Sequence, residues 1–293
     1  MTILSSSNAS PAIASLKMCF YGAGSMAEAM VRGLLDRGLT EPGQISMMNR
    51  QNAARMEELN ARYGVNTASM DADKAAMLQE ADIVFLMMKP KDAAEAIAQV
   101  RDLLHPGQLI VSVIAGMTIR TLEALLGKPI PIVRTMPNTS STIGLGATGV
   151  SCSAAVSAEQ RAIAEAMFQA VGLTTVVEER MLDVVTGLSG SGPAYVYYLM
   201  EAMIAAGSEL GLTEDAAREL TIQTVLGAAH MVKATGENPA DLRRKVTSPN
   251  GTTQAAIEKL DANQFSQTLV SAIARAAERA AEMGAEIERK ATS

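Results

Sequence analysis

The stretch KMCFYGAGSMAEAM, residues 17–30, decides the fold of this chain. Its first five residues read as a buried strand, and two glycines follow before apolar residues return at helical spacing. A strand that enters a helix through Gly22-x-Gly24-x-x-Ala27 matches the dinucleotide-binding fingerprint, with alanine at its third position. Gly22 would make the tight turn, Gly24 would admit a pyrophosphate, and Ala27 would let helix and strand pack closely. The alternative is a glycine turn without a ligand.

The residues that follow this stretch place it in a doubly wound α/β sheet. Short apolar runs recur with room for a helix between most of them, which indicates a parallel sheet wrapped by crossover helices. The strand candidates are residues 17–21, 44–48, 82–87, 108–113, 130–134 and 174–177. In that setting a nucleotide is the stronger interpretation, with cofactor contacts expected at Gly22, Gly24, Ser25 and Met26.

The pattern of apolar residues changes near residue 178. From Glu178 onward almost every window has Ala, Leu, Met, Glu and Arg at helical spacing, with breaks at Gly211, 236–239 and 248–251. We therefore expect a flexible extension over residues 1–16, a Rossmann-like dinucleotide-binding domain over 17–178, and an all-helical dimerisation and substrate domain over 179–293. Long helices without strands often complete their core against a second subunit, so a homo-oligomer is expected.

Composition limits the possible partners. The chain has 293 residues, of which 48% are apolar and 19% charged, and its net charge is −6. This charge gives no broad attraction for nucleic acid or acidic membrane, and no run approaches the ~18 apolar residues of a membrane helix. The extension lacks the pattern of a signal peptide. Cys19 and Cys152 form neither a disulfide framework nor a metal-ligand spacing, so we expect a cytoplasmic protein without a metal site.

The end of the second strand indicates the type of nucleotide. An NAD site would place Asp or Glu there, whereas this strand ends in Asn49 and Arg50. Arg50 can neutralise a 2′-phosphate while Asn49 hydrogen-bonds it, so NADPH is favoured and NAD stays possible. The alternative is that Arg50 caps a helix at the surface.

Three further turns leave strands at the edge where open α/β sheets bind ligands. The cofactor contacts expected there are Met88, Lys89, Pro90, Ala115, Gly116 and Asn138. Lys89 could instead be a surface lysine, and Asn138 could cap a turn.

Two turns in the helical half are rich in groups that suit an anion. The run VTSPNGTT, residues 246–253, places backbone N–H groups and hydroxyls ahead of a helix, and GLSGSGPAY, residues 187–195, brings backbone close to a neighbour. Both could also be plain helix starts. Neither histidine has a partner pattern, and no lysine lies between Lys128 and Lys233, which argues against an enzyme that must protonate an alkoxide. A protonated imine needs less help, and a threonine hydroxyl would suffice.

These motifs together resemble the pyrroline-5-carboxylate reductase family. The matching runs are GAGSMAEAM (22–30), MMKPKDA (87–93), SVIAGM (112–117), IVRTMPNT (132–139), VTGLSGSGPAYVYYLMEAM (185–203) and VTSPNGTT (246–253). The last two are not shared with general dinucleotide-binding enzymes. The resemblance implies reduction of 1-pyrroline-5-carboxylate to L-proline by hydride transfer from NAD(P)H, the last step of proline synthesis.

The resemblance also implies roles for individual residues. Backbone around Ser248, Gly251 and Thr252 would hold the substrate carboxylate, and Thr253 would hydrogen-bond the ring nitrogen or the carboxylate. The pocket would be shaped by Gly190, Ser191, Gly192 and Pro193. A homodimer through the C-terminal helices, with sites built from both chains and often arranged as a ring of dimers, is implied too.

The chain departs from the family pattern in three places. Asn250 replaces a usual glycine, Met87 and Met88 replace small aliphatic residues, and residues 1–16 have no counterpart. The alternatives left open are a reductase of another cyclic imine, such as a six-membered one, and a nucleotide-binding sensor or scaffold with weak turnover.

Overall fold

The computed structural model describes residues 13–50, 52–68 and 71–292. They form two compact units: one runs to Ser191 and includes the chain from Ala276 onward, and the other is Gly192–Arg275. The domain boundary expected at residue 178 rests on sequence style and stays a prediction. The compact units divide thirteen residues later, and the last helix begins in the second unit and ends in the first.

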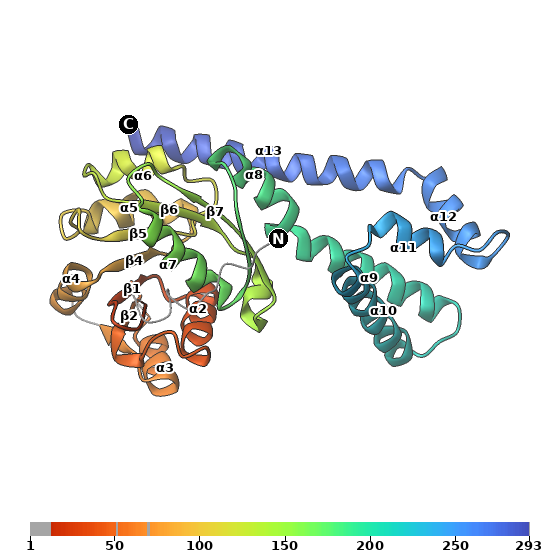
Figure 1. The fold of residues 1–293 in the computed structure, drawn as a ribbon, viewed down its shortest axis with the longest axis horizontal. Helices are drawn as coiled ribbons and strands as arrows, with labels where there is room; N and C mark the ends of the chain where they lie inside the picture. Colours follow the sequence, from red (N-terminus) through yellow and green to blue (C-terminus); the bar gives the residue numbers. More distant parts are fainter. Residues whose placement is uncertain (1–12, 51, 69–70, 293) are drawn as a thin grey trace. The chain divides into compact units, whose positions relative to one another are not determined.

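A parallel sheet wrapped by helices forms the first unit, as the sequence predicts (Figure 1). Its strand order is β3-β2-β1-β4-β5-β6-β7-β8. The strands are β1 Met18–Tyr21, β2 Ile45–Met48, β3 Asn66–Ala68, β4 Ile83–Leu86, β5 Leu109–Ser112, β6 Ile132–Met136, β7 Gly146–Cys152 and β8 Gly172–Val176. Neighbouring strands are parallel except for β6 and β7, which pair antiparallel.

Two of these strands are absent from the sequence expectation. β3 has three residues, with only Ala68 buried, and lies at the sheet edge. β7 reads GATGVSC, and its two glycines weaken the strand signal. Because β7 reverses direction, the sheet is not parallel throughout.

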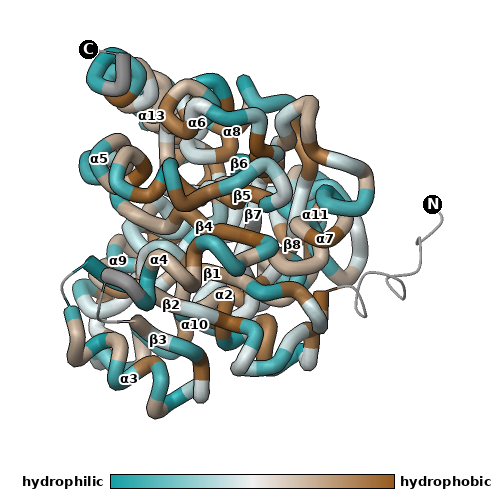
Figure 2. The backbone as a smooth tube through the Cα atoms, turned by 90° about the vertical axis from the view of Figure 1, so that its left-hand side faces the viewer, coloured by the Kyte–Doolittle hydropathy of each residue, from teal (hydrophilic) through white to brown (hydrophobic). Residues whose placement is uncertain are grey.

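Helices cover both faces of the sheet, which makes it doubly wound. The helices of this half are α2 Ser25–Asp36, α3 Ala53–Tyr63, α4 Asp71–Glu80, α5 Pro90–Val100, α6 Ile119–Leu126 and α7 Ala158–Gln169. One core contains apolar residues of α2, α3 and α7, and the other contains residues of α4, α5 and α6. Phe20 and Phe85 stack across β1 and β4 with ring centroids 4.3 Å apart. The central strands are accordingly hydrophobic, as the brown tube along β4 shows (Figure 2).

The described chain beyond residue 178 is helical, as expected. A short turn η3 (Glu179–Met181), α8 (Leu182–Val185) and a π-helical turn η4 (Thr186–Gly190) end the first unit's continuous part. The longer helices are α9 Gly192–Glu209, α10 Glu214–Thr235, α11 Pro239–Lys245, α12 Thr252–Ala262 and α13 Phe265–Thr292. Three of the four breaks between these helices fall at the predicted positions. The fourth, between α12 and α13, was not expected, and Gln264 takes a left-handed φ of +55° there.

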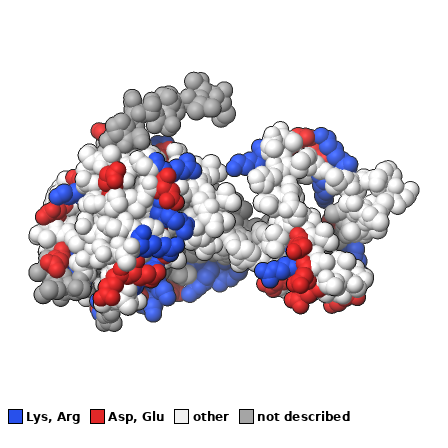
Figure 3. Space-filling model, turned by 90° about the horizontal axis from the view of Figure 1, so that it is seen from below, with Lys and Arg blue, Asp and Glu red and all other residues white. Residues whose placement is uncertain are grey.

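The second unit buries little of its own apolar surface. Only Ala217 and Thr221 are buried among residues 192–275, all of which the structure describes. The exposed apolar side chains of α9 and α10 include Val196, Tyr197, Tyr198, Leu199, Leu220, Ile222, Leu226 and Met231. Wide areas without charged residues are also visible in the space-filling view (Figure 3). Such a surface is typical of helices that bury their apolar faces in an oligomer.

Part of the expected N-terminal extension belongs to the packed domain. Residues 1–12 lie outside the described residues, but Ile13 is fully buried and Leu16 packs against the same core. The extension as predicted to residue 16 is therefore too long, because one apolar side chain anchors its end. No helix among the described residues is long and apolar enough to span a membrane.

Candidate active site

The first glycine of the fingerprint lies where only glycine fits. Gly22 has φ +121°, and a Cβ at this position would lie 2.4 Å from the carbonyl oxygen of Met87. Its N–H donates to the Met48 carbonyl at 3.1 Å. The turn thus contacts the ends of β2 and β4 together, which is why the chain needs a residue without a side chain here.

The second glycine leaves open space for a ligand. Gly24 is extended and precedes α2 without capping it by a side chain, and no described atom lies within 4 Å of an ideal Cβ. The first N–H groups of α2, at Ser25 and Met26, therefore face an open cradle. Ala27 is buried against the sheet. These features fit the pyrophosphate of a dinucleotide, which binds at such a helix start.

A charge cluster joins this turn to α3. The Glu28 carboxylate pairs with Arg55, with Arg62 at 2.9 Å, and accepts from the Tyr63 hydroxyl at 2.8 Å. The hydrogen bond from Arg55 is the main reason that the pKa of Glu28 lies below its usual value. Glu28 therefore remains ionised, and its charge is neutralised by the arginines beside the phosphate cradle.

The ends of β1 and β2 open into a cavity of about 530 Å³. Its lining includes Tyr21, Met48, Asn49, Arg50, Lys74 and Gln99. The Arg50 guanidinium lies 2.9 Å from the Glu95 carboxylate, and both side chains are more than 60% exposed. Exposed pairs contribute only ~0–1 kcal/mol, so Arg50 can exchange Glu95 for a phosphate. The sequence alone does not point to Glu95, because its position in a helix carries no signal for this contact.

Two further turns reach the same edge. Lys89 is exposed and directly precedes α5 without a side-chain capping bond, Pro90 occupies the first turn of α5, and Met88 packs against the core. Ala115 and Gly116 follow β5.

The turn after β5 also contacts the last helix. Gly116 has φ +77°, and a Cβ there would lie 2.9 Å from the backbone nitrogen of Gly284 in α13. The end of α13 therefore packs directly on this turn.

Asn138, expected to orient a ribose, makes two contacts to backbone instead. Its Nδ2 donates to the Ser189 carbonyl and its Oδ1 accepts from the Ala147 N–H, both at 3.1 Å. The side chain thus connects the end of β6 to the π-helical turn. A direct contact of Asn138 with cofactor stays a prediction.

The glycine-rich segment 187–193 is a helix irregularity followed by a helix start. Gly190 ends the π-helical turn, and its missing side chain leaves room for Met136, whose Cε would lie 2.8 Å from a Cβ. Ser191 follows, and Gly192 and Pro193 begin α9. π-turns of this kind are frequent at functional sites.

The turn 246–253 presents the start of α12. Gly251 precedes the helix without a side-chain cap, so the N–H groups of Thr252 and Thr253 lie in an uncapped first turn. The Gly251 N–H donates to the Ser248 carbonyl at 3.0 Å, and a contact of Gly251 with substrate stays a prediction. Thr253 is half-buried.

Asn250 adopts the left-handed conformation in the turn before α12. Its φ is +58°, which asparagine tolerates better than most residues. Its N–H donates to Gln254 Oε1 at 2.8 Å. Gln254 was missed, although a glutamine in the first turn of a helix is a known signal for such a cap.

The structure brings some of the expected site residues together and separates others by unit. All the expected cofactor contacts belong to the first unit, at the turns that follow β1, β2, β4, β5 and β6, and so do Gly190 and Ser191. The expected substrate contacts Gly192, Pro193, Ser248, Gly251, Thr252 and Thr253 belong to the second unit.

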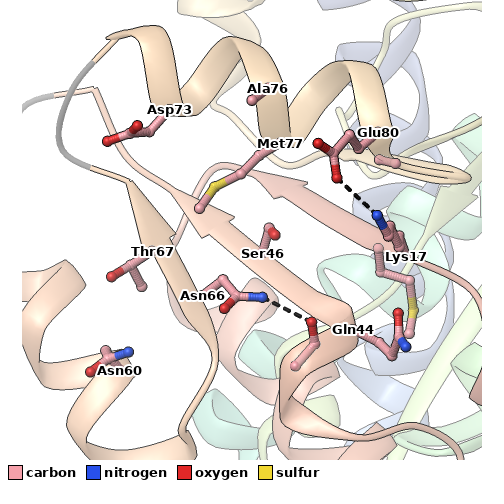
Figure 4. Close-up of a pocket in the computed structure, with 13 residues that line it drawn as sticks. Lys17, Gln44, Ser46, Asn60, Asn66, Thr67, Asp73, Ala76, Met77 and Glu80 are labelled. Atoms are coloured by element: carbon pink, nitrogen blue, oxygen red, sulfur yellow. Dashed lines mark hydrogen bonds and ion pairs between the residues drawn. The ribbon is translucent and has the colours of Figure 1, made fainter.

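Another cavity, of about 500 Å³, lies at the opposite ends of the strands. Lys17, Gln44 and Asn66 line it at or before the starts of β1, β2 and β3, and Lys17 pairs with Glu80 at 2.8 Å (Figure 4). Ligands of open α/β sheets bind at the carboxyl ends of strands, so this polar cavity is not the candidate site.

Thiol and metal chemistry find no support in the described part of the chain. No group of three His, Cys, Asp or Glu residues there is arranged to hold a metal ion. Burial raises the pKa of the Cys19 thiol to about 12, so this thiol stays protonated.

Comparison with known families gives two matches that together cover most of the chain. Residues 179–283 match the family described as pyrroline-5-carboxylate reductase dimerisation, and residues 17–116 match the family described as NADP oxidoreductase, coenzyme F420-dependent. Residues 117–178 lie between the two matches.

Individual relatives match over nearly their whole length. Pyrroline-5-carboxylate reductase 2 of Bacillus subtilis is 42% identical over 278 residues, covering 93% of this chain and 99% of the relative. The Pseudomonas aeruginosa enzyme of the same name is 40% identical, covering 92% and 98%.

Solved structures agree. The pyrroline-5-carboxylate reductase of Coxiella burnetii superposes with a TM-score of 0.85 at 36% identity, covering 92% of this chain and 98% of that one. A Plasmodium falciparum pyrroline carboxylate reductase with NADP bound superposes with a TM-score of 0.82 at 26% identity, covering 93% and 99%.

Proposed function

This chain belongs to the pyrroline-5-carboxylate reductase family, and from that premise we propose how its residues divide the work of the reaction. The protein is an NAD(P)H-dependent oxidoreductase that reduces 1-pyrroline-5-carboxylate to L-proline, the last step of proline biosynthesis. The observation that carries the mechanism is that the chain has both an open phosphate cradle at Gly24 and an uncapped helix start at Thr252. One suits the cofactor and the other suits a carboxylate.

The first unit holds NADP. Gly22 and Gly24 admit the pyrophosphate to the start of α2, and Asn49 and Arg50 receive the 2′-phosphate. The turns at Met88–Pro90 and Ala115–Gly116 border the nicotinamide half. NADPH supplies the hydride for C5 of the ring.

The second unit holds the substrate. The carboxylate accepts from the N–H groups of Thr252 and Thr253, where the positive end of the α12 dipole favours an anion. Ser248 and Gly251 shape the turn, and 190–193 shape the pocket. The Thr253 hydroxyl hydrogen-bonds the ring nitrogen. Because a protonated imine is already electrophilic, catalysis is mainly a matter of positioning.

Arg50→Ala is expected to weaken the binding of NADPH and to leave the binding of NADH nearly unchanged. A charge-assisted hydrogen bond contributes roughly 1.5–3 kcal/mol, so the KM for NADPH should rise about 10-fold to 100-fold, while the KM for NADH changes less than about 2-fold. Steady-state kinetics with both cofactors measure this. Arg161→Ala, which removes another ion-paired arginine of the first unit, is the control. The role of Arg50 would be refuted if Arg50→Ala left the KM for NADPH unchanged, or raised it by no more than the KM for NADH.

Thr253→Ala is expected to lower kcat by roughly 10-fold to 100-fold, because the substrate loses a hydrogen bond in the closed site. Thr253→Ser keeps the hydroxyl and should retain most of the activity. Thr224→Ala is the matched control, since the Thr224 hydroxyl bonds its own helix at Leu220. The proposed role fails if the alanine and serine variants have the same kcat.

We also propose that a second copy covers the apolar surface of α9 and α10, which gives a homodimer through the C-terminal helices. The dimerisation match over residues 179–283 and the exposed apolar residues support this proposal. A ring of dimers is the larger assembly we propose, and sedimentation at several concentrations tests both.

The absence of a disulfide framework supports a cytoplasmic location.

The direct test of the function is NADPH oxidation, followed by absorbance, with 1-pyrroline-5-carboxylate and with its six-membered analogue. Fast turnover of the five-membered ring is the expected result. Activity confined to the six-membered ring would assign the protein to another imine reduction, and NADPH binding without turnover of either ring would overturn the enzymatic proposal.

A further inference from the structure

We propose that Asn138 is a positioning residue, which holds the π-helical turn Thr186–Gly190 at the end of β6 by supplying a hydrogen-bond donor that Pro193 lacks. The proposal goes beyond the roles assigned above. It rests on the proposed function in one respect, namely that segment 187–193 shapes the substrate pocket.

The need for an outside donor follows from the sequence. In a helix the carbonyl of residue i accepts from the N–H of residue i+4, and for Ser189 that residue is Pro193, which has no N–H. The Ser189 carbonyl accepts from Asn138 Nδ2 at 3.1 Å instead, across 51 residues of sequence. A half-buried carbonyl next to a helix start is thereby satisfied by a side chain from the sheet.

The irregular turn is closed around this contact. The Ser191 N–H donates to the Thr186 carbonyl at 2.8 Å, which is the i to i+5 bond of a π-turn. Gly190 leaves space for the end of Met136, two residues before Asn138. The loop after β6 and the π-turn therefore fit against each other at two points.

The amide of Asn138 is itself held by the sheet. Its Oδ1 accepts from the Ala147 N–H at 3.1 Å, at the start of β7, so its orientation is set by β7 while its donor end is used by Ser189. This arrangement fixes which end of the amide faces the π-turn. It also makes the side chain a bridge between the strands that border the cofactor edge and the glycine-rich segment.

Such a bridge matters because the reaction depends on alignment. A displacement of about 1 Å between reacting groups can lower a rate by roughly 100-fold. Asn138 touches neither reacting atom in this account and acts through Ser189. Loss of the Asn138 side chain should therefore lower kcat/KM for the imine without weakening NADPH binding.

The test is Asn138→Asp, a nearly isosteric change that keeps an acceptor for the Ala147 N–H and removes the donor to Ser189. The matched control is Asn60→Asp, which removes the same kind of bond, from Asn60 Nδ2 to the Val65 carbonyl at 2.8 Å, in the same unit. We expect kcat/KM for 1-pyrroline-5-carboxylate to fall by roughly 10-fold to 100-fold in Asn138→Asp, with the Kd of NADPH changed less than about 3-fold. Asn60→Asp should change neither value by more than about 2-fold.

Two further measurements make the result specific. Pro193→Ala restores an N–H at residue 193, so the cost of Asn138→Asp should be smaller in that background than in the native chain. Hydrogen exchange of the Ser191 amide, which reports the π-turn independently of turnover, should accelerate in Asn138→Asp and not in Asn60→Asp. If Asn138→Asp does not fold, Asn138→Ala is measured in its place, because it removes the donor to Ser189 without adding a charge.

Each outcome decides the proposal. It is overturned if the Kd of NADPH rises as much as kcat/KM falls, which would make Asn138 a cofactor ligand, or if Pro193→Ala leaves the cost unchanged. Unchanged exchange at Ser191 would also overturn it. If the native protein does not reduce the imine, the proposed function fails, while the exchange and NADPH measurements still decide the role of Asn138.

Discussion

Gly22→Ala is expected to weaken NADPH binding strongly and to destabilise the first unit. The new Cβ would lie 2.4 Å from the Met87 carbonyl oxygen in a backbone conformation that side chains rarely adopt, φ +121°. Relief of this overlap must separate the ends of β1 and β4, at a cost of about 3 kcal/mol or more. We expect an apparent Tm lower by at least ~6 °C and a Kd for NADPH at least ~100-fold higher.

Gly24→Ala separates cofactor binding from stability. No described atom lies within 4 Å of its ideal Cβ, and its φ is −77°, so the folded chain should accept alanine with a Tm change below about 1 °C. The methyl group would nevertheless occupy the space of the pyrophosphate, and the Kd for NADPH should rise roughly 10-fold to 100-fold. Gly43→Ala, at another open glycine, should change neither property. Normal NADPH binding by Gly24→Ala would show that the cradle is not the phosphate site.

Arg134→Met is also expected to cause a large effect, which is a loss of folding stability and not of NADPH binding. The Arg134 side chain is 5% exposed and pairs with Glu179 and Asp183, each at 3.2 Å, and Glu179 also accepts from the Ile119 N–H at 2.6 Å. Removing the cation leaves two carboxylates side by side. The side chains of Glu179 and Asp183 are 32% and 26% exposed. We therefore expect the free energy of unfolding to fall by ~2–4 kcal/mol, slightly less than for a fully buried pair.

The controls for Arg134→Met use the same kind of contact in other surroundings. Thermal unfolding should show an apparent Tm lower by about 5–12 °C. Arg180→Met removes a pair with Glu178 whose side chains are 76% and 70% exposed, and should shift stability by less than about 0.5 kcal/mol. Adding Glu179→Gln and Asp183→Asn to Arg134→Met should recover part of the loss. A Tm for Arg134→Met equal to that of Arg180→Met would contradict the buried-pair account.

The two strands that the sequence does not predict, β3 and β7, lack a local signal of their own. β3 and β7 are strands because neighbours pair with them: Ser46 to Met48 pair with β3, and β6 and β8 pair with β7 on its two sides. Neither has an alternating or continuous apolar run long enough to be recognised alone. Pairing energy from the rest of the sheet determined both.

The site shows the same division. The fingerprint glycines, Arg50 and the run 246–253 could be recognised from residue type and spacing, because a left-handed turn, a close approach and an uncapped helix start each restrict the residues that fit. Glu95 and the contact of Asn138 with Ser189 could not, because each depends on which segment the fold places opposite a side chain.

By itself the sequence determined the doubly wound domain, the helical second half, the dinucleotide fingerprint and the family to which the chain belongs. These depend on periodicity and on short motifs whose geometry is local. Only the tertiary structure decided that β7 reverses direction, that Ile13 and the end of α13 join the first unit, and that Arg134 and Asn138 hold the segment from Glu179 to Ser189. Such contacts join residues far apart in the chain, and they form only when packing of the whole sheet brings those residues together.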